Sequence, residues 1–256
     1  MMLDGSVSYL YAPEQLARIA KLWPESKFII AVRNPLDMLP SLHQRHVFNG
    51  DEKVLNFARA WKLVEERREG RSVPRTCIDP RLLDYEQIGR LGQHVERLFA
   101  AVGRERCFVS VFDDLIADPP AHYRRLLEFL ELEPDGRTVF EPCRASAGVR
   151  FPALQRLLKR PPKATWSLLA SDADLYREGI AVERRPTTGS GVRRIKALRK
   201  QLLRWNRTNA PPRVMSAELR AAISATLRDD VRKLSDLLGR DLTHWLDSGG
   251  GNLPER

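Results

Sequence analysis

Two short apolar runs, each preceded by a helix-like segment, most constrain what this chain can fold into. Residues 28–32 (FIIAV) and residues 108–112 (FVSVF) are almost entirely apolar, and continuous runs of this length are typical of strands buried in a parallel sheet. Apolar side chains at helical spacing precede both runs, over residues 13–23 and residues 88–102. Because helix and strand alternate along the chain, the sequence predicts an α/β fold with a parallel sheet.

Three more segments are predicted to be helical. Residues 51–69 carry an apolar stripe that ends before Gly70, and another helix is expected to start at Pro119 with Asp118 as its N-cap. The last is a long amphipathic helix over residues 216–238. The regular pattern weakens before it, where the chain is rich in Arg and interrupted by Pro.

The 256 residues are enough to bury the core of one large domain, and the chain contains no long linker. We therefore expect a single domain over residues 1–256. Its parts are an α/β core (1–147), a basic, Pro-interrupted segment (148–215) and a C-terminal helical element (216–247). No stretch has the pattern of a membrane span or a signal peptide. Cys77, Cys107 and Cys143 form no disulfide or metal-ligand pattern, which predicts a cytoplasmic protein in a reducing compartment.

The formal net charge of +10 predicts an anionic ligand or partner, such as a nucleotide, an acidic glycan, nucleic acid or a membrane surface. Specific nucleic-acid binding is not expected, because the basic runs contain few aromatic residues and no recognisable motif. No metal is expected, because His43 and His46 have no third ligand in the pattern. These two histidines are interpreted as surface residues, the alternative being that they face a substrate.

Arg33 is the most informative single residue, because it directly follows the first apolar run. Ligands of parallel α/β sheets bind beyond the carboxyl ends of the strands, and an arginine beside a helix N-terminus is a typical anion site. Asn34 is predicted to cap a helix whose first and third residues are Pro35 and Asp37, with several backbone N–H groups directed into the crevice. Ser41 lies on the same helix face as Asp37 and is a candidate for the same anion. The alternative, on these residues alone, is a solvated strand end beside an ordinary helix serine.

The pattern RNPxDxxxS over residues 33–41 resembles the 3′-phosphate-binding segment of sulfotransferases that use 3′-phosphoadenosine 5′-phosphosulfate (PAPS). Three other segments resemble the same family in the same order: SYLYAPEQLARI, VFDDLIADPPAHYRRLLEFLEL and LLGRDLTHWL. The resemblance implies a P-loop-like three-layer fold with a helical C-terminal part. It also implies an enzyme that transfers a sulfuryl group from PAPS to a hydroxyl or amine of an unknown acceptor, such as a glycan or another small metabolite. The product of PAPS would be 3′-phosphoadenosine 5′-phosphate (PAP).

The resemblance implies that Arg33 and Ser41 bind the 3′-phosphate of the cofactor. Phe112 matches a position near the adenine, but we interpret it as a core residue because it closes a buried strand. Met38 and Pro40 depart from the family pattern, and Pro40 is expected to kink the helix just before Ser41.

Residues 1–26 contain no Gly/Lys-rich loop of the kind that binds the 5′-phosphosulfate in this family. From this we expect a chain that is N-terminally incomplete and inactive alone, and we assign no catalytic residue. The alternative function is a non-catalytic, polyanion-binding remnant of a sulfotransferase fold.

Two further features have both a structural and a functional interpretation. Asp113 and Asp114 resemble an acid–base pair, but after a strand and before a helix they are predicted to cap and to form salt bridges. Residues 191–205 form a basic amphipathic pattern whose apolar face is expected to pack on the domain. Peripheral membrane contact through this segment is the alternative and is not expected.

Overall fold

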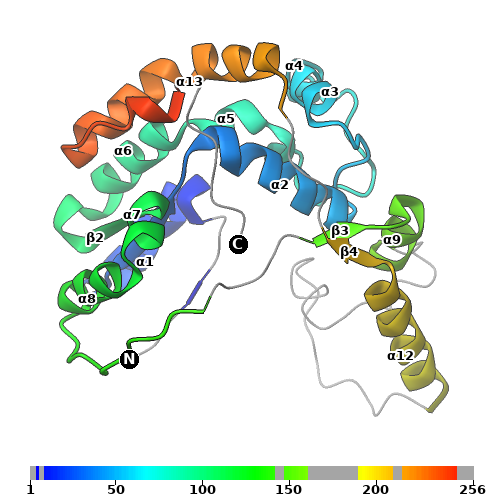
Figure 1. Cartoon of the computed structure of the whole chain (residues 1–256), viewed down its shortest axis with the longest axis horizontal. Coiled ribbons are helices and arrows are strands. Elements are labelled where there is room, and N and C mark those ends of the chain that lie inside the picture. The colour runs from blue at the N-terminus through cyan, green and yellow to red at the C-terminus, as the bar shows by residue number, and fades with distance from the viewer. Residues whose placement is uncertain (1–3, 6–8, 142–146, 161–189, 210–214, 247–256) are drawn as a thin grey trace. The chain divides into compact units, whose positions relative to one another are not determined.

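The computed structural model describes residues 4–5, 9–141, 147–160, 190–209 and 215–246 (Figure 1). Contacts within the chain group it into two compact units. The first contains Met1–Pro40, Asp84–Cys143 and Val214–Arg256, and the second contains Ser41–Leu83 and Arg144–Arg213. Helices predominate in the described residues and a small parallel sheet accompanies them, so the predicted α/β class is confirmed.

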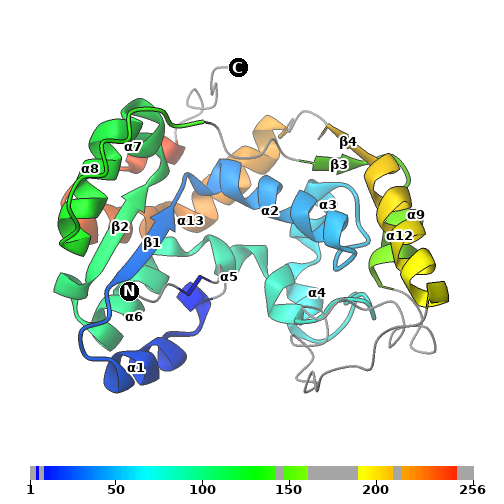
Figure 2. The same cartoon turned by 90° about the horizontal axis from the view of Figure 1, so that it is seen from below.

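The first unit is built on two parallel strands, β1 (Phe28–Val32) and β2 (Cys107–Val111). Phe28 pairs with Cys107 and Val32 pairs with Val111, so both strands end at the same edge of the sheet (Figure 2). The predicted parallel pairing is therefore confirmed. The second strand ends one residue earlier than predicted, because Phe112 is the first residue of helix α7 (Phe112–Ala117).

Three helices pack with one face of this sheet into a single core: α1 (Pro13–Leu22), α6 (Leu91–Val102) and α13 (Ala217–Leu238). Helix α13 lies beside α6 (Figure 1). Trp23 was predicted to belong to the apolar face of α1, but it follows the helix and is 53% exposed. The buried side chains of the core are Leu16, Ala20, Ile30, Val32, Leu91, Val95, Leu98, Val102, Cys107, Val111, Val231, Leu234, Leu242, Trp245 and Leu246.

The opposite face of the sheet is covered over β2 by helix α8 (Pro119–Leu130). The ring of Phe108 lies 5.6 Å from the ring of Phe129, centroid to centroid. On β1 the corresponding residue Ile29 is 46% exposed. The prediction that the first strand is buried on both faces is therefore wrong among the described residues, because α8 packs on its neighbour.

The helix predicted before β2 consists of two helices, α5 (Tyr85–Gly89) and α6, separated at Arg90. Helix α13 explains where α6 begins, because the carboxylate of Asp230 accepts hydrogen bonds from the N–H groups of Gly92 (2.7 Å) and Gln93 (2.9 Å). A Cβ at Gly92 would lie 2.3 Å from the carbonyl oxygen of Asp230, so only glycine permits this approach.

Side-chain caps fix two other helix starts, and the cap at Asp118 is the predicted one. The carboxylate of Asp118 accepts a hydrogen bond from the N–H of Ala121 at the start of α8. The hydroxyl of Ser216 accepts one from the N–H of Leu219 at the start of α13. After α13 the chain turns at Gly239, in the left-handed region, and forms the short 3-10 helix η4 (Thr243–Leu246).

Helix α2 (Pro35–Asn49) starts in the first unit, continues across Pro40 and belongs to the second unit from Ser41 onward. Two short helices follow it, α3 (Phe57–Lys62) and α4 (Val64–Arg68). The other short 3-10 helices of the described chain are η1 (Tyr9–Tyr11), η2 (Pro80–Leu83) and η3 (Arg104–Arg106).

The single helix predicted over residues 51–69 is wrong at its start. The carboxylate of Glu52 accepts hydrogen bonds from the N–H groups of Lys53 and Val54, both at 2.8 Å, and pairs with the buried guanidinium of Arg67. These bonds hold the chain in a non-helical turn until the Asn56 side chain caps α3.

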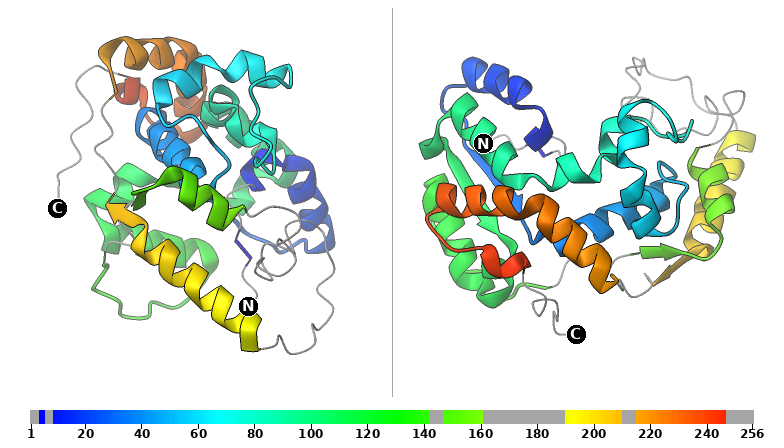
Figure 3. Two further views of the ribbon diagram at one scale, coloured as in Figure 1. Left: turned by 90° about the vertical axis from the view of Figure 1, so that its right-hand side faces the viewer. Right: turned by 90° about the horizontal axis from the view of Figure 1, so that it is seen from above.

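The rest of the second unit contains helices α9 (Pro152–Lys159) and α12 (Ser190–Trp205). Strands β3 (Ala147–Val149) and β4 (Arg207–Asn209) form an antiparallel pair next to them (Figure 3). Strands β3 and β4 and helix α9 were not predicted, because their placement depends on the buried Asn206. Its side chain accepts a hydrogen bond from the N–H of Phe151 and donates one to the side-chain oxygen of Gln155.

The apolar face of α12 was expected to pack on the domain, and this is wrong. Ile195, Leu198 and Trp205 are 54%, 56% and 51% exposed. The predicted boundaries after residues 147 and 215 stay predictions. Cys77 and Cys107 are free thiols, and Cys143 lies outside the described residues. No helix in the described part of the chain is long and apolar enough to cross a membrane.

Candidate functional site

The carboxyl ends of β1 and β2 bring Arg33 and Phe112 together. Val32 and Val111 are paired at the end of the sheet, so the residues that follow them are neighbours. The guanidinium carbon of Arg33 lies 4.5 Å from the centroid of the Phe112 ring, a cation–π distance. The expectation that Phe112 is a core residue is therefore wrong: it is half-buried, at the first position of α7, and supports Arg33.

Arg33 keeps hydrogen-bonding capacity in this position. Its Nη2 is 4.0 Å from the Asp37 carboxylate, and its Nε is buried with no hydrogen-bond partner among the described residues. The side chain is 23% exposed, which is too little for the solvated strand end that was the alternative. A guanidinium held by a ring, with an unused donor and partial access to solvent, fits an oxyanion such as a phosphate group.

The N-terminus of α2 differs from the prediction, because its first N–H groups are already used. The Leu36 N–H donates to Oδ1 of Asn34 (2.9 Å), and the N–H groups of Asp37 and Met38 donate to the Asn34 carbonyl oxygen (3.1 and 2.9 Å). Asn34 caps the helix as predicted, but the expectation of several free N–H groups in the crevice is wrong. The Asp37 carboxylate approaches Arg33, and among the described residues no hydrogen bond joins it to the N–H of the cap residue Asn34.

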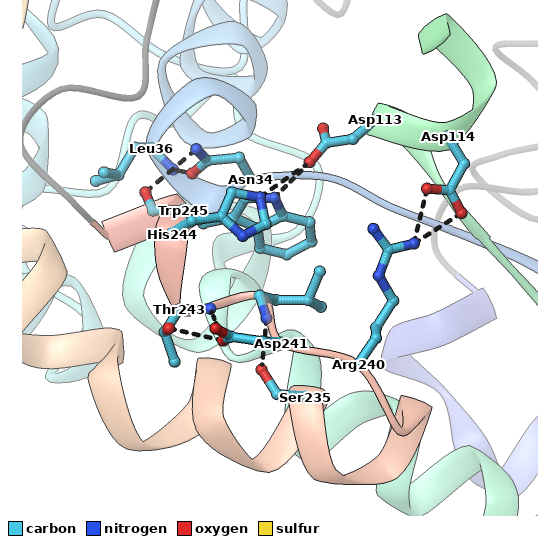
Figure 4. Close-up of polar contacts among 11 residues, drawn as sticks. Asn34, Leu36, Asp113, Asp114, Ser235, Arg240, Asp241, Thr243, His244 and Trp245 are labelled. Atoms are coloured by element: carbon cyan, nitrogen blue, oxygen red, sulfur yellow. Dashed lines mark hydrogen bonds and ion pairs between the residues drawn. The ribbon is translucent and has the colours of Figure 1, made fainter. Parts of the chain in front are cut away.

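The C-terminal segment after α13 closes over the same edge of the sheet (Figure 4). Trp245 Nε1 donates to Asp113 (2.6 Å), and the Trp245 carbonyl oxygen accepts from Nδ2 of Asn34 (3.2 Å). Arg240 Nη1 bonds both oxygens of Asp114, at 2.7 and 2.8 Å. The salt-bridge prediction for the acidic pair is confirmed at Asp114. Both carboxylates serve to fasten the closing segment.

Residues 10–136 match the sulfotransferase family. The chain carries a sulfotransferase-family domain.

A crystal structure of a sulfotransferase from Alicyclobacillus acidocaldarius is similar to the whole fold. The TM-score is 0.56 at 22% sequence identity, over 94% of this chain and 65% of that protein. The chain thus spans about two thirds of the length of that relative, and the likeness concerns the fold alone. No curated protein matches the chain. The family resemblance is confirmed over residues 10–136, and Arg33, Ser41 and Phe112 all lie within the matched residues. The segment LLGRDLTHWL lies outside the match, so its resemblance to the family stays a prediction.

Ser41, the second residue predicted to bind phosphate, is half-buried in α2 and belongs to the second unit. Arg33 belongs to the first unit. That both bind one anion therefore stays a prediction, and the geometry described for the sulfotransferase-family domain concerns Arg33.

His43 and His46 were expected on the surface, and both are buried, at 4% and 5% exposure. His43 Nε2 lies 2.7 Å from the Val54 carbonyl oxygen. Burial lowers the pKa of His43, and it lowers the pKa of His46 to about 4, although Asp51 and Glu52 nearby raise it in part. Both imidazoles are therefore neutral at pH 7, and their place in the interior argues against contact with a substrate.

One polar pair in the sulfotransferase-family domain was missed by the sequence analysis. Ser110 Oγ lies 2.8 Å from Nε2 of His122, the distance of a serine–histidine dyad. Arg125 Nη2 lies 3.3 Å from the other ring nitrogen, Nδ1. A guanidinium can only donate, so Nδ1 accepts and Nε2 carries the hydrogen that is donated to Ser110. The imidazole therefore cannot take the serine proton, and the pair holds α8 on β2.

Proposed function

We propose that this protein is of the PAPS-dependent sulfotransferase type, whose reaction transfers a sulfuryl group to a hydroxyl or amine of a small-molecule or glycan acceptor. The expected inactivity of the chain alone stays a prediction. The observation that carries the proposal is Arg33, held on the Phe112 ring at the carboxyl edge of the two parallel strands, inside a sulfotransferase-family domain. Helices on both sides of β2 support the assignment of a P-loop-like, three-layer arrangement.

In this proposal Arg33 binds the 3′-phosphate of the cofactor. Phe112 restricts the guanidinium to one plane, so little side-chain entropy is lost when a phosphate binds. The Asp37 carboxylate, 4.0 Å away, helps to orient the same group. Ser41 is proposed as a second ligand of this phosphate, on the strength of its place in the RNPxDxxxS pattern.

When bound, PAPS would supply the sulfuryl group: its sulfur–oxygen bond to the 5′-phosphate would break, PAP would leave, and the acceptor oxygen or nitrogen would bond to the sulfur and give up its proton. The 3′-phosphate is distant from that sulfur, so Arg33 is proposed to bind and orient the nucleotide, not to stabilise the transition state. Binding is therefore the property that tests Arg33 most directly.

The test is calorimetric titration of the full chain with PAP. A charge-assisted contact to phosphate contributes about 1.5 to 3 kcal/mol, so Arg33→Ala should weaken binding roughly 10- to 150-fold. Arg33→Lys should recover only part of the loss, because an ammonium cannot make the planar two-pronged contact.

Arg104 provides a matched control, since its guanidinium lies 4.7 Å from the Phe99 ring centroid, beside the opposite end of β2. Arg104→Ala should leave the affinity for PAP unchanged. Equal affinities of the wild type and Arg33→Ala would refute the assignment of Arg33, and binding of sulfated polymers with no binding of PAP would favour a non-catalytic polyanion-binding protein.

A further inference from the structure

Helix α12 exposes an apolar stripe that the rest of the described chain leaves uncovered. Ile195, Leu198 and Trp205 are each more than half exposed, and Leu202 between them is half-buried. These residues stand at positions i, i+3, i+7 and i+10, which places them along one side of the helix. Exposed aliphatic side chains in a continuous row mark an interaction surface.

Helix α9 extends this surface. Phe151, just before α9, is 49% exposed, and its ring stacks on Trp205 at a centroid distance of 5.7 Å and an interplanar angle of 20°. At the other end of α9, the Leu158 carbonyl oxygen accepts a hydrogen bond from Arg199 Nε (2.6 Å). The two helices therefore lie side by side and antiparallel (Figures 2 and 3). Leu157 on α9 adds a further side chain, 55% exposed.

The surface is strongly basic. Residues 150–160 and 190–207 contain eleven Lys or Arg and no Asp or Glu. Arg193, Arg194, Lys200 and Arg204 are exposed on α12 beside the apolar stripe. Arg160 forms a salt bridge with Asp51 at 2.7 Å. The four exposed basic side chains of α12 make the surface complementary to a negatively charged partner.

We propose that α9 and α12 form a docking surface for an anionic lipid membrane. An apolar stripe flanked by Lys and Arg is the pattern of helices that lie in the plane of a membrane interface, and aromatic side chains such as Trp205 and Phe151 favour the same depth. A sulfated glycan or a nucleic acid would satisfy the charges but leave Ile195 and Leu198 in water. A protein interface is disfavoured because its core is typically depleted of lysine.

The proposal is independent of the proposed function and is tested by sedimentation of the full chain with vesicles. We expect binding to vesicles of phosphatidylcholine with about a third phosphatidylserine at about 0.15 M salt, weaker binding at higher salt, and little binding to pure phosphatidylcholine. The triple variant Arg193→Gln/Arg194→Gln/Lys200→Gln should bind about 100-fold more weakly, since each charge contributes about fivefold.

The apolar contribution is tested by Ile195→Gln/Leu198→Gln, which should weaken vesicle binding about tenfold or more. Matched controls come from exposed residues of the same unit: Leu55→Gln/Ile78→Gln for the apolar change and Lys53→Gln/Arg59→Gln/Lys62→Gln for the charge change. Both controls should bind as the wild type does.

A second measurement needs no destabilising substitution. Vesicles with brominated acyl chains should quench tryptophan fluorescence of the wild type, and the conservative variant Trp205→Phe should lose most of that quenching. The proposal is overturned if the wild type does not bind anionic vesicles, which would leave an acidic protein as the partner. It is also overturned if the α12 variants bind like their controls, or if charge but not apolar substitutions matter.

Discussion

The sequence predicts where Arg33 lies but only part of its surroundings. The carboxyl end of a parallel strand is a predictable place for a ligand residue, and Arg33 is found there. Phe112 beneath its guanidinium was not predicted, because the register of β1 and β2 alone decides which residues meet after the strands end. Asn34 caps α2, as the sequence predicts. Its side chain also donates a hydrogen bond to the carbonyl oxygen of Trp245, 211 residues away, which the sequence does not predict.

His46 is a residue whose burial predicts a measurable pH dependence. Its pKa is about 4 in the folded chain and 6.5 when unperturbed, so the unfolded chain binds a proton that the folded chain excludes. The contribution of His46 to the unfolding free energy is therefore fully present above pH 6.5 and is lost as the pH falls toward 4. We expect His46→Gln to flatten the decline in unfolding free energy between pH 7 and pH 4 by about 2 to 4 kcal/mol, measured by urea denaturation.

The unfolding free energies of His46→Gln and the wild type are compared at each pH. Some decline should also persist in His46→Gln, since burial lowers the pKa of His43, His94 and His122 as well. Parallel profiles of His46→Gln and the wild type would contradict the burial of a neutral imidazole at this position.

At the scale of elements, the contact between α13 and the start of α6 predicts a large effect from one carboxylate. Asp230→Ala would leave the N–H groups of Gly92 and Gln93 unsatisfied in the interior, at a cost of about 2 to 4 kcal/mol in unfolding free energy. Burial raises the pKa of Asp230, while these two N–H groups lower it in part.

Asp229 is the matched control, because its side chain is 96% exposed. Its carboxylate lies 3.3 Å from the guanidinium of Arg232, in the next turn of the same helix. Asp229→Ala should change the unfolding free energy by less than about 0.5 kcal/mol. Urea denaturation of both variants measures the difference. Similar stabilities of the two variants would show that the Asp230 carboxylate does not hold α6.

Helices and strands were predicted correctly where the local sequence signals agreed. The predictions were wrong where a side chain distant in the sequence changes the local structure. Residues 28–32 form β1 as predicted, and α13 (Ala217–Leu238) lies within the helix predicted over residues 216–238. Helix α3 starts late because Glu52 binds the preceding N–H groups, and Glu52 is held there by Arg67. The spacing of residues in the sequence does not predict the pairing of Glu52 with Arg67, because that pairing depends on how α4 packs against the preceding turn.

The whole molecule combines residues from both ends of the chain at the candidate site. The family match ends at residue 136, yet Arg240 and Trp245 from the C-terminal segment bind the acidic residues after β2. A signal for this arrangement is present in residues 237–246, because LLGRDLTHWL resembles the closing segment of the family. The basic face of α12 was predicted, but the exposure of its apolar stripe was not, because an amphipathic pattern does not show which of its faces the fold will cover.

The central claim is that Arg33 recognises the 3′-phosphate of the cofactor, and titration of two nucleotides into two proteins tests it most directly. PAP and 5′-AMP differ only in the 3′-phosphate. The wild type should bind PAP about 10- to 150-fold more tightly than 5′-AMP, and Arg33→Ala should lose most of this preference while its affinity for 5′-AMP changes less than about threefold. Equal weakening of both nucleotides by Arg33→Ala, or a wild type that binds them equally, would contradict the claim.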